Sequence, residues 1–241
     1  EALFFRAFAF FDLAQVYAAP FDPQGNNSGP GIPLRLTADI AEISTRSTVQ
    51  QTYSQIINDL KEAASVLPVA VPVKSRPSRQ AVFAALARTF LAMEQYNEAL
   101  LYADSALQLY NQLIDFNTVN ATAAAPFAVF NSEVIFHSNS PGSGLLHLSR
   151  CKIDSFVYAS YNTNDLRKTV YFKNNNNGTY GFKGSYNAVT NNAFFMGLAV
   201  DELYLIKAEC LARHGSTAEA MNTLNQLLVK RWRTGTFVPF T

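Results

Sequence analysis

The sequence predicts a mainly α-helical fold in which helices pair into hairpins. Three observations indicate this: apolar residues recur at helical spacing, one hairpin pattern occurs twice, and the stretch between the copies lacks helical periodicity. The repeat is the most specific signal, because Ala87 and Ala99 are twelve residues apart and so are Ala208 and Ala220. Small residues at such positions let two helices approach closely, as in tetratricopeptide-repeat (TPR) hairpins.

The first hairpin is expected within residues 1–67. Its first helix carries an apolar face made of Leu3, Ala7, Phe10, Ala14 and Tyr17. The second helix is predicted from about Thr48 to Leu67, where Ser47 and Gln50 have the spacing of a capping box. Prolines and glycines fill residues 18–47 between them, which predicts a long loop of the kind that is usually functional or disordered.

The second hairpin is expected at residues 78–114. Ser78 is the predicted N-cap of a helix that reaches about Met93, and Asn97 is the predicted N-cap of its partner. The alanines and large apolar residues alternate as in a TPR helix pair.

The third hairpin is expected at residues 200–230, with Asp201 as the predicted N-cap and Gly215 at the turn. We expect the three hairpins to belong to one domain that covers residues 1–241.

Between the second and third hairpins, residues 115–199 predict a mostly irregular insertion that packs on the helices. This stretch is rich in Asn, Gly, Ser and aromatic residues. Val134–Phe136 and Thr169–Phe172 are typical of short strands, and Asn174–Gly178 is typical of a turn.

The composition excludes several classes of protein. A net charge of +1 without runs of like charge gives no field that would attract nucleic acid or an anionic membrane. No stretch of about 18 apolar residues occurs, so no membrane-spanning helix is predicted. Cys151 and Cys210 could form one disulfide, but two buried thiols are the favoured interpretation.

The sequence lacks the motifs of the common catalytic and metal sites. We find no HExxH, CxxC, GxSxG, Walker or dinucleotide-binding motif, so neither a metal, a cofactor nor enzyme activity is predicted. Glu133 lies four residues before His137, but both fall in a predicted strand, where they would not share a helical face.

A glycosidase would need two carboxylates that face a sugar. Most of the acidic residues instead lie on predicted helices, where solvated surface or capping is the simpler role. These residues are Asp12, Asp59, Glu62, Glu94, Glu98, Asp104, Glu202, Glu209 and Glu219. For Asp165 and Arg167 a structural ion pair is favoured over a binding role, and for Trp232 packing is favoured over stacking on a ligand.

Aromatic residues give the positive indication of binding. Eight of them occur between residues 156 and 186, interleaved with Asn, Gly and Ser: Phe156, Tyr158, Tyr161, Tyr171, Phe172, Tyr180, Phe182 and Tyr186. Sugars stack their C–H faces on such rings and pair their hydroxyls with Asn, Asp and Tyr. The alternative is that half of these rings fill the core of the insertion itself.

Several segments, taken in order, resemble one known family. They are EALFFRAFAFFDLAQVYAAPF, GIPLR, RSTVQQTYSQIINDLKEAASVLP, SRQAVFAALARTFLAMEQYNEALLYADSALQLY, NDLRKTVYF with FKGSY, and DELYLIKAECLARHGSTAEAMNTLNQLLVKRW. Together they resemble the SusD/RagB family of outer-membrane nutrient-binding lipoproteins of Bacteroidetes, over nearly the whole chain.

The resemblance implies a function and a location. Members of the family bind oligosaccharides or other nutrients without hydrolysing them, and they deliver the ligand to a SusC-like TonB-dependent transporter. They are usually lipid-anchored at the cell surface. Because the chain begins at Glu1 within a predicted helix and stops at Thr241, soon after KRW, we expect the anchor and part of the family's fold to lie outside it.

Ligand contacts in the family carry no motif, so the site is predicted by region only. We expect it between the 18–47 loop and the 156–186 part of the insertion, since loops on a rigid scaffold commonly carry function. The candidate ligand-binding residues are Phe21, Asp22, Asn26, Asn27, Tyr158, Tyr161, Asn162 and Tyr180. The alternative function is a TPR-type protein–protein adaptor that does not bind sugar.

Overall fold

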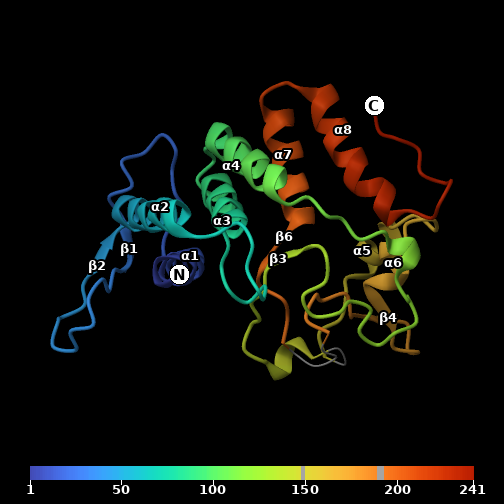
Figure 1. Cartoon of the computed structure of the whole chain (residues 1–241). Helices are drawn as coiled ribbons and strands as arrows, with labels where there is room; N and C mark the ends of the chain where they lie inside the picture. Colours follow the sequence, from blue (N-terminus) through green and yellow to red (C-terminus); the bar gives the residue numbers. More distant parts are fainter. Residues whose placement is uncertain (148–149, 189–192) are drawn as a thin grey trace.

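A computed structural model of the chain describes residues 1–147, 150–188 and 193–241. The mainly α-helical fold is confirmed (Figure 1). The scaffold consists of α1 (Ala2–Tyr17), α2 (Val49–Val66), α3 (Arg79–Ala92), α4 (Tyr96–Leu109), α7 (Val200–Arg213) and α8 (Thr217–Leu228).

The scaffold helices follow one another in space as they do in the chain. The contacts within pairs are α1 with α2, α3 with α4 and α7 with α8, and the contacts α2–α3 and α4–α7 join the pairs. Because α4 packs directly on α7, the insertion leaves and re-enters the helical stack without interrupting it.

The repeat alanines lie where the helices approach each other. Ala87 and Ala99 are fully buried between α3 and α4, and Ala208 and Ala220 are buried in the last pair. Their predicted packing role is therefore confirmed. Gly215 occupies the turn between α7 and α8 with a φ of 79°, a conformation that favours glycine.

The capping box of α2 lies one residue later than the sequence predicts. Gln51 N donates to Thr48 Oγ1 at 3.1 Å, and Thr48 N donates to Gln51 Oε1 at 2.9 Å. The predicted pair of Ser47 and Gln50 is wrong, because the Ser47 hydroxyl donates to the carbonyl oxygen of Ile32 at 2.7 Å and so serves the neighbouring strand.

Of the other predicted N-caps, only Ser78 is confirmed, since its hydroxyl accepts a hydrogen bond at the start of α3. Asn97 lies inside α4, because a tight turn at Glu94, with φ 56°, lets that helix begin at Tyr96. Asp201 is also wrong as a cap: a strand runs directly into α7, which places Asp201 within the first helical turn.

The 18–47 loop contains a hairpin that the sequence pattern did not predict. β1 (Pro30–Pro33) and β2 (Arg46–Thr48) pair antiparallel beside α1 and α2. Gly31 permits this packing, because a Cβ there would lie 2.2 Å from the Thr52 hydroxyl. The proline and glycine content that indicated a loop therefore also allowed a close strand contact.

The insertion is built of short elements around a second core. Its elements are η1 (Phe116–Thr118), β3 (Val134–Phe136), η2 (Gly144–Leu146), α5 (Ser155–Ser160), α6 (Arg167–Val170), β4 (Phe172–Asn174), β5 (Tyr180–Phe182) and β6 (Leu198–Ala199), and η3 (Val229–Arg231) follows α8. The buried members of the second core are Phe116, Phe127, Val134, Val170, Tyr186 and Ala199.

The strand predictions for the insertion are partly right. β3 is confirmed, and it pairs antiparallel with β6 at the far end of the insertion. The strand predicted at Thr169–Phe172 is wrong in its first half: α6 ends at Val170, and the strand β4 begins at Phe172. At the start of α6, the Asp165 carboxylate accepts a hydrogen bond from the backbone N–H of Arg167 at 3.0 Å, a contact that favours a helical turn there. The predicted turn at Asn174–Gly178 joins β4 to β5.

The two cysteines are separate thiols. Cys210 is buried as predicted, but Cys151 is exposed, so the prediction of two buried thiols is wrong for it. Within the residues described, no helix combines the length and the apolar character needed to cross a membrane.

Candidate functional site

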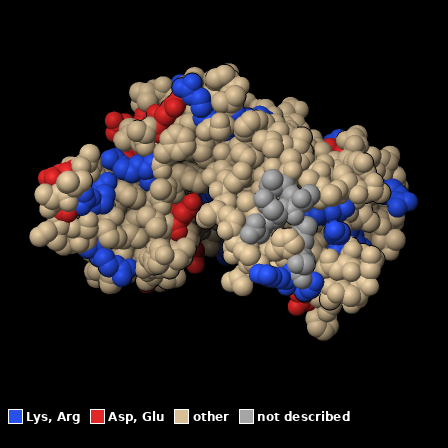
Figure 2. Space-filling view, turned by 90° about the horizontal axis from the view of Figure 1, so that it is seen from below, with Lys and Arg blue, Asp and Glu red and all other residues tan. Residues whose placement is uncertain are grey.

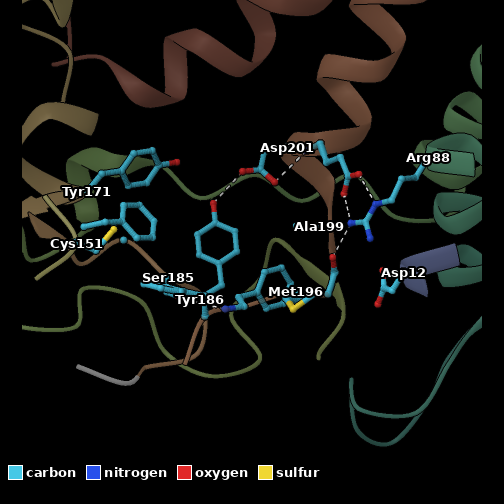
Figure 3. A pocket seen from close by; sticks show the side chains of 15 residues that line it. Asp12, Arg88, Cys151, Tyr171, Ser185, Tyr186, Met196, Ala199 and Asp201 are labelled. Atoms are coloured by element: carbon cyan, nitrogen blue, oxygen red, sulfur yellow. Dashed lines mark hydrogen bonds and ion pairs between the residues drawn. The ribbon is translucent and has the colours of Figure 1, made fainter. Parts of the chain in front are cut away.

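A cavity of about 710 Å³ opens where the insertion meets α1, α3 and α7 (Figure 3). Its lining residues are Asp12, Arg88, Cys151, Tyr171, Phe182, Gly184, Ser185, Tyr186, Phe194, Phe195, Met196, Gly197, Ala199, Asp201 and Glu202. The view from below shows a hollow between the helical half and the insertion, with acidic residues on the helical side (Figure 2). A cavity of this size is in the range of small-ligand sites.

One end of the cavity is polar and is formed by three helices. Arg88 of α3 makes a two-pronged ion pair with Glu202 of α7, with both N–O distances 2.6 Å, and it also donates to the Gly197 carbonyl oxygen at 2.7 Å. Asp12 of α1 faces this pair, and no hydrogen bond to its carboxylate occurs among the described residues. Burial raises the pKa of Asp12, and the Arg88 charge partly opposes that rise.

A chain of polar contacts lies behind the cavity floor. The Tyr186 hydroxyl contacts the Glu133 carboxylate and lies 3.1 Å from Asp201 Oδ2. Arg231 pairs with the other oxygen of Glu133 at 2.5 Å, with both side chains almost wholly buried. One hydroxyl proton serves only one of the two carboxylates.

Which carboxylate receives the Tyr186 hydroxyl proton depends on whether Asp201 is itself protonated. Asp201 lines the cavity at a depth where protein surrounds most of its carboxyl group, and this burial, followed by the Glu133 charge, raises its pKa to about 6. Below that pH, the neutral Asp201 carboxyl group is able to donate to the Tyr186 oxygen, which leaves the Tyr186 hydroxyl proton for Glu133. The floor therefore carries a carboxyl group that is neutral in mild acid and charged in mild base.

The opposite side of the cavity is an apolar wall of rings from the insertion. Phe182 and Phe194 lie 5.9 Å apart between ring centroids, and Phe195 lies 5.6 Å from Tyr186. Gly184 allows the backbone of this wall to pack directly against Tyr171, because a Cβ at that position would lie 2.3 Å from the Tyr171 ring. The cavity thus joins ring faces on one side to carboxylates and a guanidinium on the other.

The candidate residues of the 18–47 loop stabilise that loop. Phe21 is buried and packs edge-on against Tyr53 at 5.4 Å. Asp22 and Asn27 exchange two hydrogen bonds of 2.8 Å, and Asn26 accepts one from the backbone N–H two residues later. Asn and Asp commonly close turns in this way, and none of the four lines the cavity.

The candidate residues of the insertion form a separate ring cluster around α5 and β5. Tyr158 and Tyr180 stack on each other with ring centroids 3.5 Å apart, and Tyr161 meets Phe172 edge-on at 5.4 Å. Asn162 accepts a hydrogen bond from a backbone N–H two residues later. This cluster does not line the cavity either, so its predicted contact with a ligand stays a prediction.

The structure does not bring the two predicted segments together, so a single site between them is wrong. The β1–β2 hairpin lies beside α1 and α2 at one end of the molecule, whereas α5, α6 and β4 lie at the other (Figure 1). The insertion leaves from α4 and packs near the end of α8, where Leu166 N donates to the Arg231 carbonyl oxygen at 2.8 Å. The middle helices therefore separate it from the 18–47 loop.

Sequence reasoning missed the acidic residues of the cavity. Asp12 and Glu202 were predicted as solvated surface or capping residues, yet both line the cavity. Asp59 was predicted in the same way, but it is buried and accepts two hydrogen bonds of 2.7 Å from Arg6. One signal was available: Asp201 and Glu202 stand where the aromatic insertion meets a helix.

Two structural roles predicted from the sequence are confirmed. Asp165 is buried and pairs with Arg167 at 2.6 Å, which fixes the start of α6. Trp232 packs against Phe237 with ring centroids 5.7 Å apart. Neither residue lines the cavity.

Comparisons with known proteins agree with the resemblance drawn from the sequence motifs. Residues 1–91 match a SusD-like family described as starch-binding and associating with the outer membrane. No curated protein matches the chain.

Solved structures match the fold over almost the whole chain. A putative sugar binding protein from Bacteroides vulgatus has a TM-score of 0.79 at 23% identity, and the match covers 98% of this chain and 58% of that protein. For a SusD superfamily protein from Bacteroides thetaiotaomicron the TM-score is 0.77 at 22% identity, with 98% and 59% covered. A SusD-like carbohydrate binding protein from Bacteroides vulgatus gives 0.76 at 23%, with 99% and 56% covered. The chain thus spans somewhat less than three fifths of these proteins.

Proposed function

We propose that this chain, whose fold is that of the SusD superfamily structures, binds a glycan in the cavity between the insertion and α1, α3 and α7. The observation that carries the proposal is the pairing of a ring wall with a polar end in one cavity. A sugar ring presents apolar C–H faces to aromatic rings, and its hydroxyls bond to carboxylates and guanidinium groups. The starch-binding family description and the sugar-binding relatives support a carbohydrate as the ligand.

We propose binding without hydrolysis. Glycosidases use a general acid together with a second carboxylate that acts as nucleophile or base. Around this cavity Glu202 is held by Arg88, and Asp201 contacts Tyr186. Among the described lining residues, Asp12 is therefore the one carboxylate without a hydrogen-bond partner.

The proposed place of action is the outer-membrane surface, where the chain would pass its ligand to a SusC-like TonB-dependent transporter. The family description, which associates its members with the outer membrane, supports the location. The transporter and a lipid anchor are implied by the family resemblance.

The alternative function is a peptide-binding adaptor. A polar groove of about 340 Å³ lies between α4, α7 and α8, lined in part by Gln108, Asn111 and Gln226. Side-chain amides of this kind can bond to an extended peptide backbone. If substitutions in this groove abolished binding of a peptide while the cavity stayed intact, the adaptor function would be favoured.

Isothermal titration against a panel of neutral oligosaccharides tests glycan binding. Phe194→Ala removes part of the ring wall and should weaken binding about tenfold. Phe156→Ala is the matched control, because this ring is 84% exposed and lies outside the cavity. A failure of every glycan to bind, or equal affinity in the two variants, would contradict the proposal. Release of reducing sugar by the purified protein would contradict its non-catalytic part.

A further inference from the structure

The charged side chains inside the cavity are mostly acidic. Among the lining residues that the structure describes, Asp12, Asp201 and Glu202 are acidic and Arg88 alone is basic. Glu202 holds that cation through both carboxylate oxygens, so the Arg88 charge is already balanced. The carboxylates of Asp12 and Asp201 remain, and they give the cavity an excess of negative charge once Asp201 ionises.

Asp12 is the most available of these groups. It projects toward the cavity from α1, next to the Arg88–Glu202 pair (Figure 3). Partial burial of its carboxyl group weakens the screening that water provides at an open surface. A ligand hydroxyl or ammonium group can donate to it, whereas a ligand carboxylate would lose its own hydration and meet a like charge.

We propose that the cavity selects glycans without acidic groups, neutral or amino-bearing, and that Asp12 is the residue that rejects uronic acids. This inference rests on the proposed glycan binding. It identifies the class of ligand that the same site accepts.

The basic residues of the insertion do not reverse this selection. Lys183 is turned away, with its ammonium group donating to the carbonyl oxygens of Ala121 and Ala123 at 2.5 and 3.2 Å. Arg167 is paired with Asp165. Other basic residues lie on the outer surface beside the hollow (Figure 2), where salt screens charges over about 8 Å at physiological ionic strength. They attract an anion to the rim of the cavity, but they do not offset the desolvation of a ligand carboxylate or its repulsion by Asp12 inside the cavity.

The selection is tested with glycans that share a backbone and differ only in charge. Maltohexaose, cellohexaose and mannohexaose are each titrated beside their C6-oxidised counterparts, in which carboxylates replace hydroxymethyl groups. Chitosan hexaose supplies an amino-bearing partner for cellohexaose. In buffer of physiological salt and neutral pH, we expect each neutral or amino-bearing hexamer that binds to do so at least tenfold more tightly than its oxidised counterpart.

Two variants then test whether Asp12 is the residue responsible for the selection. Asp12→Asn keeps the shape and removes the charge, so the preference against oxidised glycans should shrink about five- to tenfold. Glu219→Gln makes the same change of charge on the exposed face of α8, outside the cavity, and should leave the preference as it is. Equal or tighter binding of the oxidised glycans by the unaltered protein, or an unchanged preference in Asp12→Asn, would overturn the inference alone. Absence of binding to every glycan would overturn glycan binding itself and the inference with it.

Discussion

The helical scaffold and the insertion are held together by different kinds of interaction. In the scaffold, consecutive helices pack through small buried residues such as Ala87 and Ala99. In the insertion, short elements surround a ring cluster and are joined by polar contacts between residues far apart in sequence, such as Arg231 with Glu133 and Lys183 with Ala121. The scaffold is stabilised by repeated local packing, whereas the insertion depends on a few specific long-range partners.

This contrast explains where the cavity forms. The ring wall comes from the insertion and the charged end comes from the scaffold helices. The cavity therefore forms only when the insertion is correctly positioned on the helices. The buried contacts among Arg231, Glu133, Tyr186 and Asp201 hold the two regions together. Arg231 lies in η3 and Asp201 in α7, whereas Glu133, just before β3, and Tyr186 belong to the insertion. Variants that act on one region or on their junction can test the comparison.

The largest effect is expected from Arg231→Met. The change leaves Glu133 buried without its cation, and breaking a buried pair in this way costs about 3–5 kcal/mol of unfolding free energy. Urea unfolding measures the loss, and Arg231→Met with Glu133→Gln should recover part of it. Arg213→Met breaks the exposed pair with Glu209 and the contact of the guanidinium with the Tyr96 ring, and it serves as the control, with a much smaller loss of stability. Equal midpoints for the two single variants would show that the junction is not held as described.

The next effect concerns pH. The Asp201 pKa is about 6 in the folded protein against 3.8 for an ordinary Asp, mainly through burial and then through the Glu133 charge. The folded state therefore binds more protons than the unfolded state between these values, so this group makes stability fall as the pH rises from about 4 to about 6. The difference between the two pKa values corresponds to roughly 3 kcal/mol.

Asp201→Asn tests this dependence, since the amide cannot ionise and can still donate to Tyr186. Chemical unfolding of both proteins at a series of pH values should show the variant gaining stability relative to the unaltered protein above pH 6 and not at pH 4. A constant difference across that range would mean that Asp201 does not titrate in the folded state.

Overpacking of the scaffold should give a smaller loss. Ala87→Leu forces extra methyl groups between α3 and α4 and should destabilise the protein by about 1–3 kcal/mol. Ala208→Leu should cost less within that range, because Ala208 is 9% exposed whereas Ala87 is fully buried. Ala9→Leu, at an exposed position of α1, controls for the change in helix propensity. Unchanged melting temperatures of both buried variants would contradict the placement of Ala87 and Ala208 at the contacts between paired helices.

The smallest effect is expected at the ring cluster of the insertion. Tyr158→Ala removes the stack on Tyr180 and should cost about 0.5–1.5 kcal/mol beyond the loss of buried area. Phe156→Ala alters the neighbouring, almost fully exposed ring and should leave the melting temperature unchanged. Titration of glycans into Tyr158→Ala, Tyr161→Ala and Tyr180→Ala checks the remaining binding hypothesis, since reduced affinity with an intact fold would assign the cluster a ligand contact.

The sequence predicted the scaffold well because the information is local. The helical stripes, the Ser78 cap and the turn at Gly215 each depend on residues within a few positions of one another, and all three are present. Errors at helix starts were of one or two residues. Ser47 and Thr48 are both good N-caps, and the strand beside Ser47 decides between them. The helices α4 and α7 begin before Asn97 and Asp201 because a tight turn and a strand lead directly into them.

The candidate site was mostly beyond sequence reasoning, because its parts meet only in three dimensions. Asp12, Arg88 and Glu202 come from three helices, and nothing in their local patterns distinguishes them from solvated surface residues. Conversely, the Tyr158 and Tyr180 rings matched a sugar-binding composition yet stack on each other. Composition identified the region that supplies rings, but the packing of distant segments chose which rings reach the cavity.

The pairing of β3 with β6 has a consequence for how such a protein can change over generations. These strands hold the two ends of residues 137–197 side by side against α3. Since the ends are already closed by the strand pair, lengthening or shortening the segment between them costs little extra closure entropy. The length and sequence of the segment that supplies the ring wall can therefore change while the helical scaffold keeps its structure.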